Sequence, residues 1–163
     1  MREILSEAFK HHLWANVNLL DVCERLPDQA LDADATGTYG TIRDTLVHLF
    51  AAEERYLTAM TGRGGSEDPL KEGTFPGMSE LRRRALATGE ELIGLAENLA
   101  SNEIIRGERD GRQYEIPISI FFAQAINHGT DHRAHVCTAL TQQGMGPPNL
   151  DVWMYLRTGA RGR

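Results

Sequence analysis

The sequence predicts an all-α protein, an antiparallel four-helix bundle with a small β-hairpin between its third and fourth helices and a short C-terminal helical turn. Apolar residues recur at steps of three and four along four long segments, which is the pattern of amphipathic helices. Connections rich in Gly, Pro and small polar residues separate these segments. With 163 residues, of which 41% are hydrophobic and 25% charged, the chain is expected to form one domain over residues 1–163.

The first half of the chain is predicted to hold two helices. An apolar stripe predicts a helix over residues 1–26, which Pro27 ends. Residues 27–40 are small, acidic and turn-rich, so they are expected to form a loop with little regular structure. The second helix is expected from Thr41 to about Thr61.

Two acidic residues of this second helix are singled out. Asp44 lies three positions after Thr41, as in a capping box. Glu53 falls inside the apolar arc, where a carboxylate needs a partner or a raised pKa. A structural ion pair is the expected explanation for Glu53.

The second half is predicted to begin with a long loop. Two β-prone runs flank Asp110-Gly111, a dipeptide that suits a tight hairpin turn. The elements expected here are a third helix over 79–100, the hairpin over 103–117, a fourth helix over 118–143 and a helical turn within 150–156.

Charge and apolar content exclude several kinds of partner. The net charge of -6 disfavours nucleic acid, because binding a phosphate backbone relies on clustered Lys and Arg. No apolar run approaches the ~20 residues of a membrane span, and the charged first residues predict a cytoplasmic protein. Cys23 and Cys137 form no paired ligand motif and are expected to be reduced thiols.

Three histidines stand at helical spacing in the predicted fourth helix. His128 and His132 are four residues apart, so both can aim a ring nitrogen at one point, and His132 with His135 is an alternative pair. His48, on the margin of the second helix's apolar arc, is the candidate third ligand. Three protein ligands would leave a coordination position open to water or substrate.

The residues alone do not decide which metal binds, which group orients His48, or which residue acts as an acid or base. Imidazole suits Zn, Ni, Fe and Cu alike. Asp44 is a candidate to accept the second N–H of His48, although an N-cap role competes. No catalytic residue is assigned, and Glu53 and His135 are the candidates for an acid or base. His12 is adjacent to another histidine, cannot share an ion with it, and is expected at the solvated surface.

Several stretches together resemble the DinB/YfiT-like family of four-helix bundle proteins, and the likeness covers nearly the whole chain. These stretches are Trp14-Ala15-Asn16, Thr41 to Leu49, Asn127 to Arg133 and Gly144 to Leu156. The resemblance implies an up-down-down-up bundle, a homodimer, and one divalent transition metal (Zn, Ni or Fe) bound by one histidine of the second helix and two of the fourth. By motif these metal ligands are His48, His128 and His132, and His135 stands where the family commonly shows Gln.

The resemblance leaves two functions open. The first is a metal-dependent enzyme that activates a small thiol or a water to attack a small-molecule substrate, as a thiol S-transferase, isomerase or hydrolase would. A low-molecular-weight thiol would then be the cosubstrate. The second is a non-catalytic, stress-associated metal-binding and dimerisation module. Kinship of fold and site fixes neither the metal nor the substrate.

Overall fold

The computed structural model describes residues 2–62, 69–100, 102–109 and 111–159. Its elements confirm the predicted four helices, the hairpin and the C-terminal turn, while Asp110 of the predicted hairpin turn lies outside the described residues. In chain order the elements are α1 (Arg2–Cys23), the 3-10 helix η1 (Asp28–Asp32), α2 (Ile42–Thr61), α3 (Met78–Asn98), β1 (Ile104–Arg109), β2 (Arg112–Pro117), α4 (Ile118–Gln142) and α5 (Val152–Arg157).

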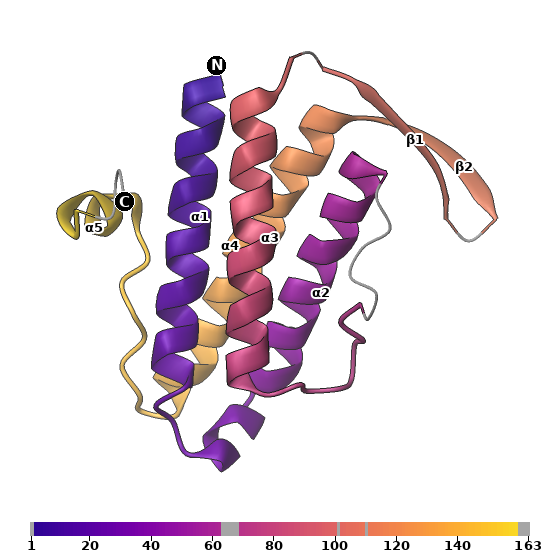
Figure 1. Cartoon of the computed structure of the whole chain (residues 1–163). Helices are drawn as coiled ribbons and strands as arrows, with labels where there is room; N and C mark the ends of the chain where they lie inside the picture. The colour runs from indigo at the N-terminus through magenta and orange to yellow at the C-terminus, as the bar shows by residue number, and fades with distance from the viewer. Residues whose placement is uncertain (1, 63–68, 101, 110, 160–163) are drawn as a thin grey trace.

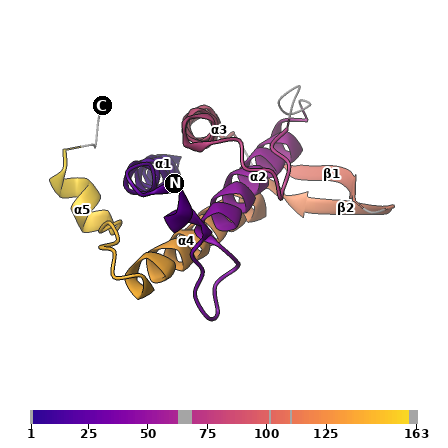
Figure 2. The same ribbon diagram turned by 90° about the horizontal axis from the view of Figure 1, so that it is seen from below.

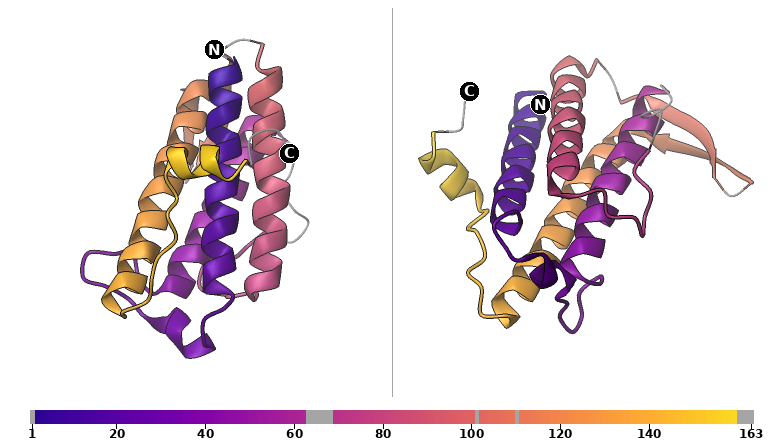
Figure 3. Two further views of the ribbon diagram at one scale, coloured as in Figure 1. Left: turned by 90° about the vertical axis from the view of Figure 1, so that its left-hand side faces the viewer. Right: turned by 60° about the horizontal axis from the view of Figure 1, so that its bottom comes forward.

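The four long helices form an up-down-down-up bundle (Figure 1). α1 and α4 run in one direction and α2 and α3 in the other. α1 packs chiefly against α3 and α2 against α4, as the view from below shows (Figure 2). α5 lies across the outer side of α1, at the end of an extended segment that follows α4 (Figure 3). None of the helices within the described ranges is both long enough and apolar enough to cross a membrane.

Two apolar clusters fill the bundle, one toward each end. One is built around Leu19, Leu46 and Leu140, and the other around Phe9 and Phe122. Three of the helices carry buried polar side chains at positions between the two clusters. They are His12 and Asn16 of α1, Glu53 of α2, and Arg133 of α4. The predicted histidine pair of α4 stands at the same level.

The start of α2 confirms the predicted capping box. Thr41 Oγ1 accepts a hydrogen bond from the backbone N–H of Asp44 at 3.0 Å, and the Thr41 hydroxyl donates to Asp44 Oδ2 at 2.7 Å. The first of these bonds pairs a backbone N–H that a helix end otherwise leaves without a partner, and the second holds the two side chains together. They fix the start of α2 about two turns before His48.

The segment before α2 differs from its prediction. It contains η1 instead of irregular structure only, because Leu31 is 3% exposed and packs into the apolar cluster at that end of the bundle. The burial of this apolar side chain stabilises the helical turn.

The β-hairpin projects from one end of the bundle (Figure 1). Its strands pair antiparallel, from Ile104 opposite Pro117 to Arg109 opposite Arg112. The backbone N–H of Ile118 donates to the carbonyl of Glu103 at 2.7 Å, which ties the start of α4 to the hairpin.

Candidate metal centre

Helices α2 and α4 bring three histidines into one group. His128 and His132 stand one turn apart on α4, and His48 meets them from α2. Each ring offers one nitrogen, and these three nitrogens lie within 4.8 Å of one another. The predicted meeting of the two helices at these residues is therefore found, and the group could hold a metal ion.

One pair of ring nitrogens already has the spacing that a shared ion requires. His128 Nε2 lies 3.2 Å from His48 Nε2. Two ligands of one tetrahedral Zn²⁺, each ~2.0–2.1 Å from the ion, are roughly 3.3 Å apart. The ring of His132 completes the group, with its centroid 4.3 Å from that of His128 and 4.8 Å from that of His48.

Several ring nitrogens in and beside the three-histidine group have no hydrogen-bond partner among the described residues. They are Nδ1 of His48, His128, His132 and His135, all of them buried. An unsatisfied buried polar atom costs about 1–3 kcal/mol, so four in one place call for an explanation. Imidazole is a good ligand for divalent transition metals. An ion between the facing Nε2 atoms of His48 and His128 would leave the Nδ1 atoms of these two rings to carry the ring protons.

The histidines of α4 are held in the form that binds metal. Burial, with the neighbouring His128 and His48 adding to it, lowers the pKa of His132 to about 4. Burial and then His48 also lower the pKa of His128. Both rings are therefore neutral at neutral pH, and the neutral imidazole is the ligand form.

Two side chains that the sequence did not single out border His48. The ring of Tyr39 stacks on that of His48 with centroids 4.1 Å apart. Glu72 Oε2 lies 3.3 Å from His48 Nδ1 without hydrogen-bond geometry, and Glu72 Oε1 pairs with Arg55 at 2.9 Å. Burial works against the charge on Glu72, but His48 and Arg55 outweigh it, so the pKa of Glu72 lies below its ordinary value.

Of the two roles open to Asp44, capping α2 and accepting the second N–H of His48, the structure supports the first. Its carboxylate accepts the Thr41 hydroxyl in the capping box. The carboxylate beside His48 is that of Glu72, from the segment between α2 and α3. Both Tyr39 and Glu72 lie in connecting segments, where helical periodicity gives no information about position.

Glu53 and His12 lie together in the interior. Glu53 is fully buried, as its place in the apolar arc predicts, and its Oε1 lies 2.7 Å from His12 Nε2. The expectation that His12 lies at the solvated surface is wrong, because α1 turns it inward and leaves it 1% exposed. His135 stays outside the three-histidine group, with its ring 5.3 Å from that of His132.

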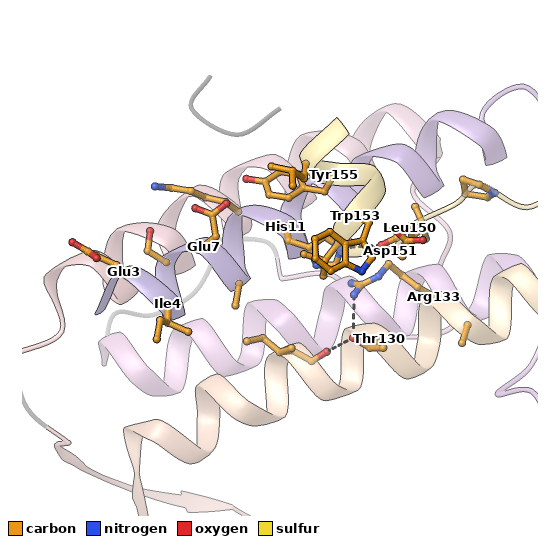
Figure 4. A pocket seen from close by; sticks show the side chains of 18 of the residues that line it. Glu3, Ile4, Glu7, His11, Thr130, Arg133, Leu150, Asp151, Trp153 and Tyr155 are labelled. Carbon is orange, nitrogen blue, oxygen red and sulfur yellow. Dashed lines mark hydrogen bonds between the residues drawn. The ribbon is translucent and has the colours of Figure 1, made fainter. Parts of the chain in front are cut away.

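A separate groove of about 1390 Å³ lies between α1, α4 and α5 (Figure 4). His11, Arg133, Trp153 and Tyr155 are among the described residues that line it, and the three grouped histidines are not. The groove and the histidine centre are therefore different surfaces of the protein.

Comparison with known proteins agrees with this fold. The family model that matches the chain is the DinB family, over residues 1–162. A DinB-like protein from Bacillus cereus of known crystal structure superposes with a TM-score of 0.68 at 20% sequence identity, covering 90% of this chain and 95% of that one. No curated protein sequence matches the chain.

Proposed function

Because the chain belongs to the DinB family, we propose that it is a metal-dependent enzyme in which His48, His128 and His132 hold one divalent transition metal, Zn, Ni or Fe. A low-molecular-weight thiol is the proposed cosubstrate, and an electrophilic small molecule the substrate. The meeting of three imidazole nitrogens within 4.8 Å, from two helices, carries this proposal. Three protein ligands leave a position for a thiol or a water, as in catalytic zinc sites.

Solvent access supports a catalytic role over a closed structural one. The side chain of His48 is 19% exposed, and Tyr39, which stacks on it, is 47% exposed. The ring of Tyr56 stands edge-on to that of His128, with centroids 5.7 Å apart. The two tyrosine rings give the centre apolar walls against which a small molecule could bind.

The proposed reaction is a thiol transfer. A divalent ion held at this centre would lower the pKa of a bound thiol, so that thiolate forms near neutral pH. The sulfur forms a bond to the electrophilic carbon, the leaving group departs with the bonding electron pair, and the thiol proton passes to solvent. The chain contributes neutral, oriented imidazoles, since burial lowers the pKa of both His128 and His132. With water in place of the thiol, the same site would support hydrolysis.

The test is a thiol screen on metal-loaded protein. Cysteine, glutathione, bacillithiol and mycothiol are each offered with a chlorodinitrobenzene electrophile, and thiol consumption is followed. We expect metal-dependent turnover with at least one thiol, its loss in His48→Ala, and its persistence in His135→Ala.

The same screen, together with the melting temperature after chelation, distinguishes the enzyme from the non-catalytic module. Stoichiometric metal without turnover of any of the four thiols would favour the non-catalytic module. For that module, chelation should lower the melting temperature strongly. For the enzyme, the folded apo-protein should persist, because the apolar clusters are complete without the ion.

A second copy of the chain is the proposed macromolecular partner, bound over the groove between α1, α4 and α5. Four large apolar side chains on its rim are strongly exposed, namely Ile4 (76%), Val152 (59%), Trp153 (71%) and Leu156 (47%). Several large exposed apolar side chains around one groove are typical of interaction sites. Trp153→Glu should convert a dimer into a monomer in sedimentation experiments, and a monomeric wild type would contradict the proposal.

The remaining proposed partners are small molecules. The net charge of -6 opposes binding to a phosphate backbone, so a salt-sensitive affinity for DNA would contradict this part of the proposal. The thiol cosubstrate fits a cytoplasmic location, where thiols are kept reduced.

A further inference from the structure

Four buried polar side chains from three helices form one hydrogen-bonded network, here called the polar frame: His12 and Asn16 of α1, Glu53 of α2 and Arg133 of α4. None is more than 5% exposed. His12 Nε2 lies 2.7 Å from Glu53 Oε1, and Asn16 Nδ2 donates to the same oxygen at 3.1 Å. On the other side, Arg133 Nη1 donates to Asn16 Oδ1 at 2.8 Å and lies 3.3 Å from His12 Nδ1.

Glu53 and Arg133, at the two ends of the polar frame, determine which groups between them donate and which accept hydrogen bonds. Burial opposes ionisation of Glu53, but His12, Asn16 and Arg133 outweigh it, so the pKa of Glu53 lies below its ordinary value. An ionised carboxylate only accepts hydrogen bonds, and a guanidinium only donates them. With Arg133 donating to Nδ1, His12 donates from Nε2 to Glu53 Oε1. Asn16 donates and accepts in the same sense, so α1 supplies two parallel bridges between an anion of α2 and a cation of α4.

The polar frame meets α4 at the residue that follows each of the two proposed ligands on that helix. Gly129 follows His128, and Arg133 follows His132. Neighbouring helical residues point about 100° apart, so the histidines reach α2 while the residues after them reach α1. A Cβ at position 129 would lie 2.3 Å from His12 Cε1 and 2.9 Å from Arg133 Nη1, so only glycine permits this approach.

We propose that the polar frame is a positioning device for the metal centre, which fixes the rotation and height of α4 against α1 and α2 so that His128 and His132 stay aimed at His48. This inference rests on the proposed metal site. Apolar packing alone tolerates some rotation or sliding of a helix, whereas a directional network is satisfied in one register. A rotation of α4 by one residue would turn the histidine pair by about 100° and break both bridges.

Two variants disturb the frame in different ways. Glu53→Gln keeps the shape but presents an amide N–H₂ to groups that themselves donate, and it leaves Arg133 without its counter-charge. Gly129→Ala inserts a methyl group against His12. The control is Leu92→Ala on α3, which opens a cavity at a fully buried position and lowers stability with the frame intact.

Each protein is titrated with Co²⁺ while its visible spectrum is recorded, and each apo-protein is studied by long-range proton–nitrogen NMR of the histidine rings. We expect His12 as the neutral Nε2–H tautomer in the wild type. Both frame variants should weaken Co²⁺ binding by about tenfold or more, a loss typical of residues that orient metal ligands. They should also shift the ring signals of His128 and His132, whereas Leu92→Ala should change neither.

The inference is overturned if the frame variants bind Co²⁺ like the wild type with unchanged ring signals. It is equally overturned if Leu92→Ala weakens binding and moves the signals as much as they do. A wild type that binds no Co²⁺ would remove the proposed metal site alone. In that case the ring signals of the apo-proteins still decide whether the frame positions the histidines.

Discussion

Glu72 Oε2 lies 3.3 Å from Nδ1 of His48, while Nε2 of the same ring faces His128 Nε2 at 3.2 Å. One imidazole thus has a carboxylate beside one nitrogen and a candidate metal position beside the other. Metal-bound histidines usually donate their second N–H to a carboxylate, which orients the ring and raises its basicity, and Glu72 is the carboxylate within reach of Nδ1. Arg55 pairs with the other oxygen of Glu72 at 2.9 Å and holds the carboxylate in place.

Glu72→Gln should therefore weaken metal binding by about 10-fold to 100-fold, because the ring of His48 loses its anionic partner. The Glu72 side chain is 45% exposed, so little stability should be lost. Affinity is measured by competition with a chromophoric chelator. Asp44→Asn is the matched control on the cap of α2, and it should leave metal affinity unchanged while lowering the free energy of unfolding by up to ~1 kcal/mol. Equal losses of affinity in the two variants would contradict the role given to Glu72.

The metal-free protein should lose stability as the pH falls from 6.5 toward about 4. The pKa of His132 is lowered from 6.5 to about 4 in the folded state, so the unfolded chain takes up a proton first. The contribution of this neutral ring is fully present above about pH 6.5 and is lost as the pH falls through that window. Urea unfolding at a series of pH values measures the slope. His132→Gln should flatten the slope in this window, and an unchanged slope would refute the assignment to His132.

Phe122→Ala should lower the free energy of unfolding by about 3–5 kcal/mol, as is typical for removing a buried aromatic side chain. Phe122 is 2% exposed and stands edge-on to Phe9 with ring centroids 5.4 Å apart. Metal stoichiometry should be retained, because the aromatic pair lies in the apolar cluster at one end of the bundle. Denaturant titration measures the free energy of unfolding, and elemental analysis measures the metal stoichiometry. A decrease in the free energy of unfolding below about 1 kcal/mol would contradict the prediction and indicate that the cluster repacks.

The helices and the histidine group could be predicted from the sequence because both depend on helical spacing. His128 and His132 share a face of one helix, and His48 lies on the margin of the apolar arc of another. The resemblance to a known family then implies that these three residues are the ligands. Tyr39 and Glu72 could not be found in this way, since their positions depend on how connecting segments pack on the bundle. His12 was misplaced for a related reason. Its buried partner, Glu53, is 41 residues away in the chain, and local periodicity does not reveal such a partner.

The central claim is that imidazoles from α2 and α4 hold the same ion. Elemental analysis of protein purified without a nickel column tests it most directly. About one divalent transition metal per chain is expected in the wild type and in His135→Ala, and close to none in His48→Ala, His128→Ala or His132→Ala. Full metal content in folded His48→Ala would contradict the claim.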